Sequence, residues 1–190
     1  MAGNSTNDRE FALLDMPLPT GGIPHFDPRA PRPPYVRWLE SFARTRVGRG
    51  FGIKVAARLD PWLLKASGGR LGLFVGGPTA ALTTTGARSG EPRTAAIFYF
   101  SEGDDVILIA SNFGQDRHPA WYHNLKAHPR ATLSRSGVTA EYEAVEVFDE
   151  GERTRLFVLA DALYQGYADY RERTAAIGRQ VPIMRLSVVR

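Results

Sequence analysis

The sequence predicts a fold of the α+β or β-barrel class, with about six mostly antiparallel strands and three or four helices inserted between them. Short runs rich in β-branched and aromatic residues alternate with glycine-containing turns, as in residues 79–110, and this pattern is typical of hairpins. The helical segments lack the regular strand–helix alternation that builds a doubly wound parallel sheet.

Length and composition limit the class of protein. The chain has 190 residues, for which one domain is the expectation, and it contains no cysteine, which excludes disulfides, thiolate catalysis and cysteine-ligated metals. The net charge of +4 favours anionic partners. There is no run of eighteen apolar residues and no apolar signal segment, so we expect a cytoplasmic protein. Basic residues are dispersed and no nucleic-acid-binding motif occurs, so no nucleic acid is expected as a partner.

Residues 1–34 form a proline-rich arm, and residues 35–190 form the predicted domain. The arm contains seven prolines, which cannot sustain a helix or a sheet ladder, so it is either extended or disordered. Apolar residues such as Ile23 and Phe26 would allow it to pack on the body. Residues 35–65 repeat apolar positions at helical steps between basic ones, which suits a core-facing helix or, alternatively, a peripheral contact with a membrane.

Three strands are predicted in the middle of the chain. Residues 79–85 and 93–100 flank a polar loop, as in a hairpin, and residues 106–110 are apolar at every position, which is typical of a strand covered on both faces. Pro119 suits the first turn of a helix that Pro129 prevents from continuing.

The last third of the chain predicts a hairpin, a helix and a strand. Residues 131–135 and 139–148 are expected to pair across a Ser-Gly turn. Asp149 and Glu152 have capping-box spacing, so a helix begins there, and Gly166 weakens it. Residues 183–189 form the final strand.

The polar loop at residues 85–93 is a candidate anion site. The guanidinium forks of Arg88 and Arg93 suit phosphate or carboxylate, and Gly86 and Gly90 let backbone N–H groups approach an anion closely. The alternative is a solvated hairpin loop whose charges are incidental.

Aromatic and histidine residues follow this loop. His118, His123 and His128 stand five residues apart, a spacing that does not suit a helical metal-binding pair, so no metal site is predicted. Trp121 and Tyr122, between them, are either core residues or a wall beside a ligand.

Tyr164, Tyr167 and Tyr170 form a second constellation. Steps of three place them on one face of a helix, where they are either an aromatic core stripe or a functional cluster. A phenol is a reasonable proton donor at neutral pH.

The order of these motifs resembles a known family. TTTG-x-RSG-x-PR, a strand, a Gly-Asp turn, a strand ending in Ala-Ser and then HP-x-WY-x-NL resemble the deazaflavin (F420)-dependent nitroreductases and F420H2-dependent quinone reductases. The resemblance is dense over residues 82–133, resumes over residues 164–186, is weaker over residues 37–77 and is absent from residues 1–34. It implies a split β-barrel and hydride transfer from reduced F420 to a quinone, a nitro compound or an activated double bond.

The resemblance also implies which residues form the site. F420 carries a phosphate and an oligoglutamate tail, so its site needs positive charge, backbone donors and an apolar wall. The three tyrosines would lie over the open face of the deazaflavin as catalytic residues, with Tyr167 facing the acceptor. Asn112 stands where some relatives carry lysine, which removes one charge from the site. The residues expected to contact the cofactor are Thr85, Arg88, Ser89, Gly90, Arg93, Thr94, Ala110, Ser111, Asn112, Gly114, Pro119, Trp121 and Tyr122.

Two other functions remain open at this point. One is a split-barrel reductase that uses FMN, and the other is a non-catalytic protein that binds F420 or another cofactor. A small-molecule electron acceptor is the expected partner, and a monomer is the expected state.

Overall fold

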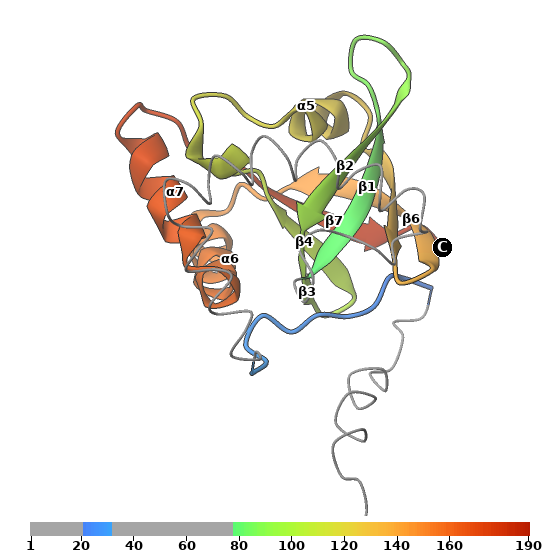
Figure 1. Ribbon diagram of the computed structural model, residues 1–190, viewed down its shortest axis with the longest axis horizontal. Coiled ribbons are helices and arrows are strands. Elements are labelled where there is room, and N and C mark those ends of the chain that lie inside the picture. Colours follow the sequence, from blue (N-terminus) through green and yellow to red (C-terminus); the bar gives the residue numbers. More distant parts are fainter. Residues whose placement is uncertain (1–20, 32–77) are drawn as a thin grey trace, which may run out of the picture.

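The computed structural model describes residues 21–31 and 78–190 (Figure 1). The predicted helix at residues 35–65 lies outside the described residues. The described strands are β1 (Thr79–Thr85), β2 (Pro92–Phe98), β3 (Phe100–Glu102), β4 (Asp105–Ile109), β5 (Arg130–Arg135), β6 (Val138–Glu146) and β7 (Ile183–Val188). The helices are the short 3-10 helix η3 (Asn112–Gly114), α5 (Ala120–Ala127), α6 (Glu150–Leu163) and α7 (Gly166–Ala175).

The strands form one antiparallel sheet in the order β2-β1-β5-β6-β7-β4-β3. Strands β2 and β3 stand at opposite ends of this order, yet only Tyr99 separates them along the chain. Because successive Cα atoms are about 3.8 Å apart, the two edges must approach each other, and the sheet therefore curls into a split barrel. The α+β split-barrel prediction is confirmed, but the single strand predicted at residues 93–100 is broken at Tyr99, which gives seven strands where about six were expected.

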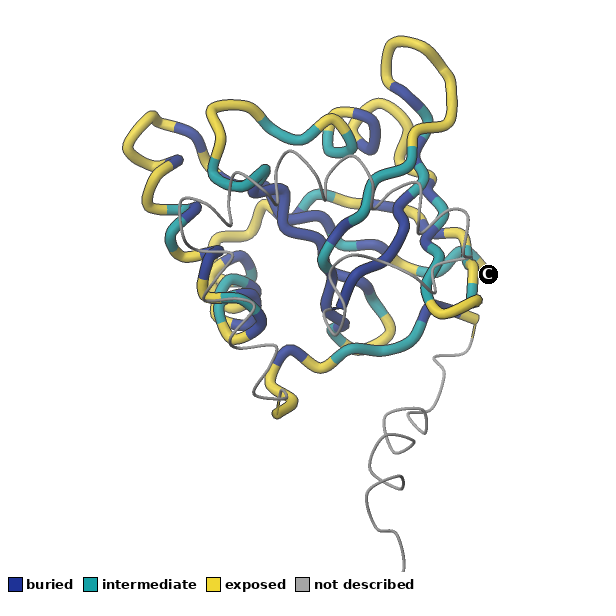
Figure 2. Tube along the Cα trace, in the orientation of Figure 1, coloured by how far each residue is buried: buried dark blue, intermediate teal, exposed yellow. Residues whose placement is uncertain are grey.

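Strand β4 separates two apolar cores. Val106 and Leu108 pack inside the barrel, whereas Ile107 and Ile109 pack against α6 and α7. This alternation follows from the two-residue period of a strand, and it confirms that β4 is covered on both faces. Figure 2 shows the buried segments at the centre of the sheet and on the inner side of α6.

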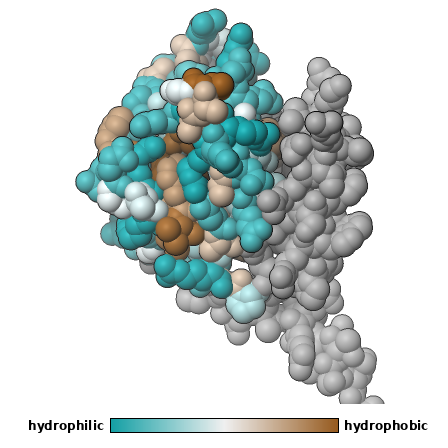
Figure 3. Space-filling model, turned by 90° about the vertical axis from the view of Figure 1, so that its left-hand side faces the viewer, coloured by the Kyte–Doolittle hydropathy of each residue, from teal (hydrophilic) through white to brown (hydrophobic). Residues whose placement is uncertain are grey.

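The outer side of α6 and α7 is mostly hydrophilic, with apolar side chains in small areas (Figure 3). Val158 is 61 % exposed on α6, and Ile177 is 58 % exposed beyond the end of α7. Exposed apolar residues that stand singly are ordinary features of a protein surface.

Residues 21–31 form a strap that packs on the barrel. Ile23 is 1 % exposed, and its backbone N–H donates to the Tyr142 hydroxyl at 2.8 Å. The Tyr99 hydroxyl donates to the Pro24 carbonyl at 2.6 Å. The strap thus satisfies the hydroxyls of two buried tyrosines, and for these residues the packed form of the arm is confirmed.

Two local predictions in the last third of the chain are confirmed. β5 and β6 pair directly on either side of the Ser136–Gly137 turn. The Asp149 carboxylate accepts a hydrogen bond from the Glu152 N–H at 2.7 Å and so caps α6.

The helix that should carry all three tyrosines on one face is instead broken in two. α6 ends at Leu163, the next residue Tyr164 has an extended backbone, and α7 begins at Gly166. A Cβ on residue 166 would stand 2.2 Å from Cε1 of Tyr164, so glycine lets the Tyr164 ring fold against the start of α7. The three rings meet because the chain turns between the helices.

Candidate functional site

The β1–β2 loop, residues 86–91, is a closed hairpin loop. Strand pairing extends to Thr85 and Pro92, and the Gly86 N–H donates to the Glu91 carbonyl at 2.9 Å. The Gly90 N–H donates to the Gly86 carbonyl at 2.9 Å, and Gly90 has a φ of +68°, which favours glycine. The predicted hairpin is confirmed, and its tip is stabilised by its own backbone.

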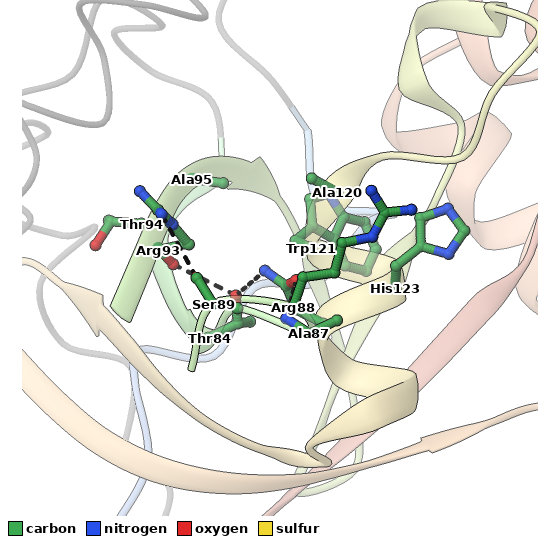
Figure 4. Close-up of a pocket in the computed structure, with 12 residues that line it drawn as sticks. Thr84, Ala87, Arg88, Ser89, Arg93, Thr94, Ala95, Ala120, Trp121 and His123 are labelled. Carbon is green, nitrogen blue, oxygen red and sulfur yellow. Dashed lines mark hydrogen bonds between the residues drawn. The ribbon is translucent and has the colours of Figure 1, made fainter. Parts of the chain in front are cut away.

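A cavity of about 650 Å³ lies between this loop, β2 and the start of α5 (Figure 4). Figure 4 shows Arg93 beside Thr94, Arg88 beside His123, and Ser89 between the two arginines. Five residues predicted from the sequence line the cavity: Arg88, Ser89, Arg93, Thr94 and Trp121. The structure adds Thr84, Gly86, Ala87, Ala95, Ala120, His123 and Asn124.

The positive charge of this cavity is available to a ligand. Arg88 and Arg93 are exposed, and no carboxylate in the described part of the chain forms an ion pair with either. Among the described residues, the one side-chain hydrogen bond that Arg93 donates goes to the Ser89 hydroxyl, at 3.5 Å. Two unpaired guanidinium groups and nearby hydroxyls fit a phosphate or carboxylate, which is the chemistry that an F420 tail requires.

The β4–α5 loop, residues 110–119, does not line this cavity. Its Asn112, Phe113 and Gly114 all have positive φ values, of 49°, 56° and 70°. The Asn112 side chain donates to the Arg117 carbonyl at 2.8 Å, so it holds the loop itself. Ala110 is fully buried and Ser111 is 8 % exposed, so Ala110 presents no exposed atom to a ligand in this structure.

Arg179, which the sequence did not single out, holds the β4–α5 loop from beneath. The residue is 9 % exposed, and its guanidinium donates to the carbonyls of Ala110 at 2.8 Å, Ser111 at 3.2 Å and Gln115 at 2.7 Å. Its Nε donates to Nδ1 of His118 at 3.1 Å. These bonds span more than sixty residues, so no local sequence pattern indicates them.

Neither His118, in the loop before α5, nor Tyr122, on α5, lines the cavity. Burial lowers the pKa of His118, and the nearby Arg179 and His123 lower it further. The Tyr122 hydroxyl donates to Glu146 at 3.1 Å; burial raises the pKa of Tyr122 to about 12, and this carboxylate contributes to the rise. Pro119 precedes α5 as its N-terminal flanking residue. Of the two predicted aromatic wall residues, only Trp121 lines the cavity.

The tyrosine cluster lies at the far end of β2. The ring centroids of Tyr164, Tyr167 and Tyr170 are 5.7–6.2 Å apart, and the Tyr164 and Tyr170 hydroxyls are 3.4 Å apart. Tyr167 is 4 % exposed and Tyr170 is 7 % exposed, whereas Tyr164 is half-buried and its ring lies 6.3 Å from Phe98. Burial raises the pKa of Tyr167 and of Tyr170, so both phenols stay protonated at neutral pH.

The described part of the chain contains neither a membrane-spanning helix nor a metal-binding cluster. No helix there is both long and apolar enough to cross a bilayer. No three His, Asp or Glu side chains gather there in a group that could hold a metal ion.

Comparison with known proteins identifies the family. The family described as F420H(2)-dependent quinone reductase matches residues 56–187. This chain belongs to that family. F420H(2)-dependent quinone reductases of two Mycobacterium tuberculosis strains are each 32 % identical to it over 157 residues, which cover 80 % of this chain and 96 % of the relative.

Solved structures of related proteins share the fold. One, an F420-H2 dependent reductase named FDR-A, has a TM-score of 0.52 and 32 % identity over 58 % of this chain and 94 % of its own. Another, described as a domain-swapped dimer, has the same TM-score and identity over 58 % of this chain and 80 % of its own. The quinone reductase family therefore accounts for both the loop motifs and the curled sheet.

Proposed function

We propose that this protein transfers a hydride from reduced F420 to a quinone. The observation that carries the proposal is the pair of unpaired arginines, Arg88 and Arg93, at a cavity in a chain that belongs to the F420H(2)-dependent quinone reductase family. F420, when bound, supplies the hydride. The protein's own part is to bind the anionic portion, orient the ring system and exclude water.

The β1–β2 loop is the proposed site of the phosphate and tail. Arg88 and Arg93 supply charge from the two sides of the cavity, and the Ser89 hydroxyl lies between them. Trp121 supplies an apolar wall from α5. Thr85, Gly90, Thr94 and the β4–α5 loop stay predicted contacts for the rest of the cofactor.

Strand β2 links this cavity with the tyrosine cluster. Thr94, Ala96 and Phe98 alternate along one face of the strand, and Phe98 packs near Tyr164. From Thr94, which lines the cavity, to Phe98 the strand spans about 14 Å, at about 3.4 Å per residue. A cofactor held at its tail by the arginines could therefore extend along β2 with its ring near the tyrosines, and the quinone is proposed to bind there.

Burial moves the proposed acceptor contact from Tyr167 to Tyr164. Tyr167 is almost fully enclosed by the second core, whereas Tyr164 is half-buried beside Phe98. We assign Tyr164 the contact with the acceptor and Tyr167 the support of its ring. Tyr164→Phe is then expected to lower quinone turnover by up to ~10²-fold, the low end for general acid catalysis, because a quinone can also take its proton from water. Tyr167→Phe should leave turnover nearly unchanged, and the reverse order would restore the original assignment.

We propose that the protein acts as a cytoplasmic monomer, and peripheral contact with a membrane stays a prediction. The relative described as a domain-swapped dimer makes oligomeric state the property to measure. Light scattering of the full chain with and without F420, and its distribution between soluble and membrane fractions, would test both parts of this proposal.

The deciding experiment compares F420 and FMN on the purified protein. We expect F420 to bind and FMN to bind much more weakly, and the F420-loaded protein to reduce a soluble quinone when reduced F420 is supplied. Tighter binding of FMN would favour the FMN-dependent alternative. F420 binding without turnover of any quinone or nitro acceptor would favour a non-catalytic binding protein.

A further inference from the structure

One amide side chain, outside the set predicted from the sequence, joins α5 to the β1–β2 loop. Asn124 is 7 % exposed, and its Oδ1 accepts a hydrogen bond from the Ala87 N–H at 2.9 Å. Its Nδ2 donates to the Thr84 hydroxyl at 2.9 Å. Because a backbone N–H can only donate, the orientation of the amide is fixed by the network: oxygen to the loop, nitrogen to the strand.

These two bonds reach the backbone beside both arginines. Ala87 immediately precedes Arg88, so its N–H fixes the backbone from which the Arg88 side chain projects. The Thr84 hydroxyl, which accepts from Asn124, donates in turn to the Arg93 carbonyl at 3.4 Å. Asn124 therefore bonds to the residue before Arg88 and, through the Thr84 hydroxyl, to the backbone carbonyl of Arg93.

The position requires an asparagine. It must present one acceptor and one donor from a short, planar group, in a place where an unpaired polar atom would be costly. An aspartate would keep the acceptor for Ala87 but could not donate to Thr84, and a leucine of similar size would keep neither.

We infer that Asn124 is a positioning residue that holds Arg88 and Arg93 in their anion-binding arrangement. The inference rests on the proposed function, since it assigns Asn124 a role in the affinity for F420. The remaining bonds described for the loop tip run within the loop itself or from Arg93 to the Ser89 hydroxyl, so without Asn124 the loop must be ordered when the anion binds. Loss of Asn124 should therefore weaken the affinity for the cofactor and leave the hydride-transfer step unchanged.

The first test measures F420 dissociation constants in a double-mutant cycle. Asn124→Leu is expected to weaken F420 binding about tenfold, with turnover at saturating F420 close to wild type. In a chain that already carries Arg88→Ala and Arg93→Ala, the same substitution should change affinity by less than about twofold, because the groups it positions are gone. An equal loss in both backgrounds would overturn the inference, since a general structural defect would not depend on the arginines.

The second test needs no cofactor. The Ala87 amide should exchange its hydrogen faster in Asn124→Leu than in wild type, and at the wild-type rate in Asn124→Asp, which keeps the acceptor. Thr84→Val is the matched control, because it removes the hydroxyl but leaves the Ala87 bond; its Ala87 exchange should match wild type. If the leucine variant does not fold, Asn124→Ala takes its place. Unchanged Ala87 exchange in the substituted protein overturns the inference.

The two tests separate this inference from the proposed function. If wild-type protein binds no F420, the proposed function fails, whereas Ala87 exchange still decides whether Asn124 holds the loop. If wild type binds F420 but the cycle shows no coupling, the function stands and the role of Asn124 does not.

Discussion

The two loops next to α5 are held in opposite ways. The β1–β2 loop is tied by a neutral amide, Asn124. Arg88 in this loop and Arg93 at the start of β2 are exposed, and no carboxylate of the described residues pairs with either. The β4–α5 loop is tied by a buried cation, Arg179, whose donors are directed to backbone carbonyls and to His118.

The comparison distinguishes arginines that are available to bind a ligand from an arginine that stabilises the fold. A guanidinium that already donates to three carbonyls and an imidazole has little left to offer a ligand, whereas an exposed and unpaired one can neutralise an anion. Arginine content alone therefore does not indicate an anion site: Arg93 and Arg179 are the same residue type in two different roles. Substitutions in the two loops should accordingly affect different properties of the protein.

The largest effect is expected from Arg179→Met. It leaves the Ala110, Ser111 and Gln115 carbonyls short of a donor, and at about 1–3 kcal/mol for a buried unsatisfied group the unfolding free energy should fall by roughly 3 kcal/mol. Urea denaturation would measure it. Arg173→Met is the matched control. Arg173 is exposed and its hydrogen bond to the Phe113 carbonyl is long, at 3.4 Å, so this substitution should lower the unfolding free energy by less than about 1 kcal/mol. Equal losses for both would erase the distinction between the loops.

The second effect concerns binding and not stability. Arg93→Ala should weaken F420 binding by roughly 1.5–3 kcal/mol, typical of a hydrogen bond to a charged group, because its charge is available to the ligand. Its unfolding free energy should change by less than about 0.5 kcal/mol, as expected for a surface substitution. Fluorescence titration and urea denaturation of the same preparation would show both; unchanged affinity in a folded protein contradicts the assignment.

A smaller effect compares one glycine from each loop. Gly90 and Gly114 have nearly equal φ values, of +68° and +70°, so alanine at either should cost about 1–2 kcal/mol of left-handed strain. A Cβ at residue 90 meets nothing within 4 Å, whereas one at residue 114 stands 3.0 Å from the Arg173 guanidinium. Thermal unfolding should therefore show a greater loss for Gly114→Ala, and Arg173→Met should remove the excess.

The smallest effect is a pH dependence confined to the β4–α5 loop. The pKa of His118 lies below its ordinary value of 6.5, chiefly through burial and then through Arg179 and His123, with Glu146 acting in the opposite direction. The folded state thus prefers the neutral imidazole, so stability is complete above pH 6.5 and decreases as the pH falls below it. The protection factors of the loop amides, which correct for the pH dependence of intrinsic exchange, should decrease between pH 6.5 and 5. His118→Asn keeps an acceptor for Arg179 without a titrating group and should abolish this decrease; its persistence would assign the effect elsewhere.

Local features of the fold were predictable from the sequence, and long-range ones were not. The Asp149 cap and the Ser136–Gly137 hairpin depend on residues within a few positions of each other, so their patterns are visible in the chain. The break at Tyr99 depends on which strands stand at the edges of the sheet, and no short window contains that information.

The candidate site divides in the same way. Arg88 and Arg93 stand out because their residue type and spacing alone suit an anion. Asn124 and Arg179 act on partners 37–69 residues away, as hydrogen-bonded side chains whose types are unremarkable in sequence. The burial of Tyr167 could not be predicted from the sequence either, because three tyrosines at steps of three suit a core stripe and an open face equally well.

The strap has a consequence for synthesis on the ribosome. Ile23 bonds to Tyr142, so 119 residues separate the two partners along the chain. At roughly 5–20 residues per second, the ribosome delivers Tyr142 about 6–24 s after Ile23. During that interval the strap lacks one of its principal partners, and its apolar residues remain open to chaperones. The strap is translated well before Tyr142 and can therefore complete its docking only after that residue has been synthesised.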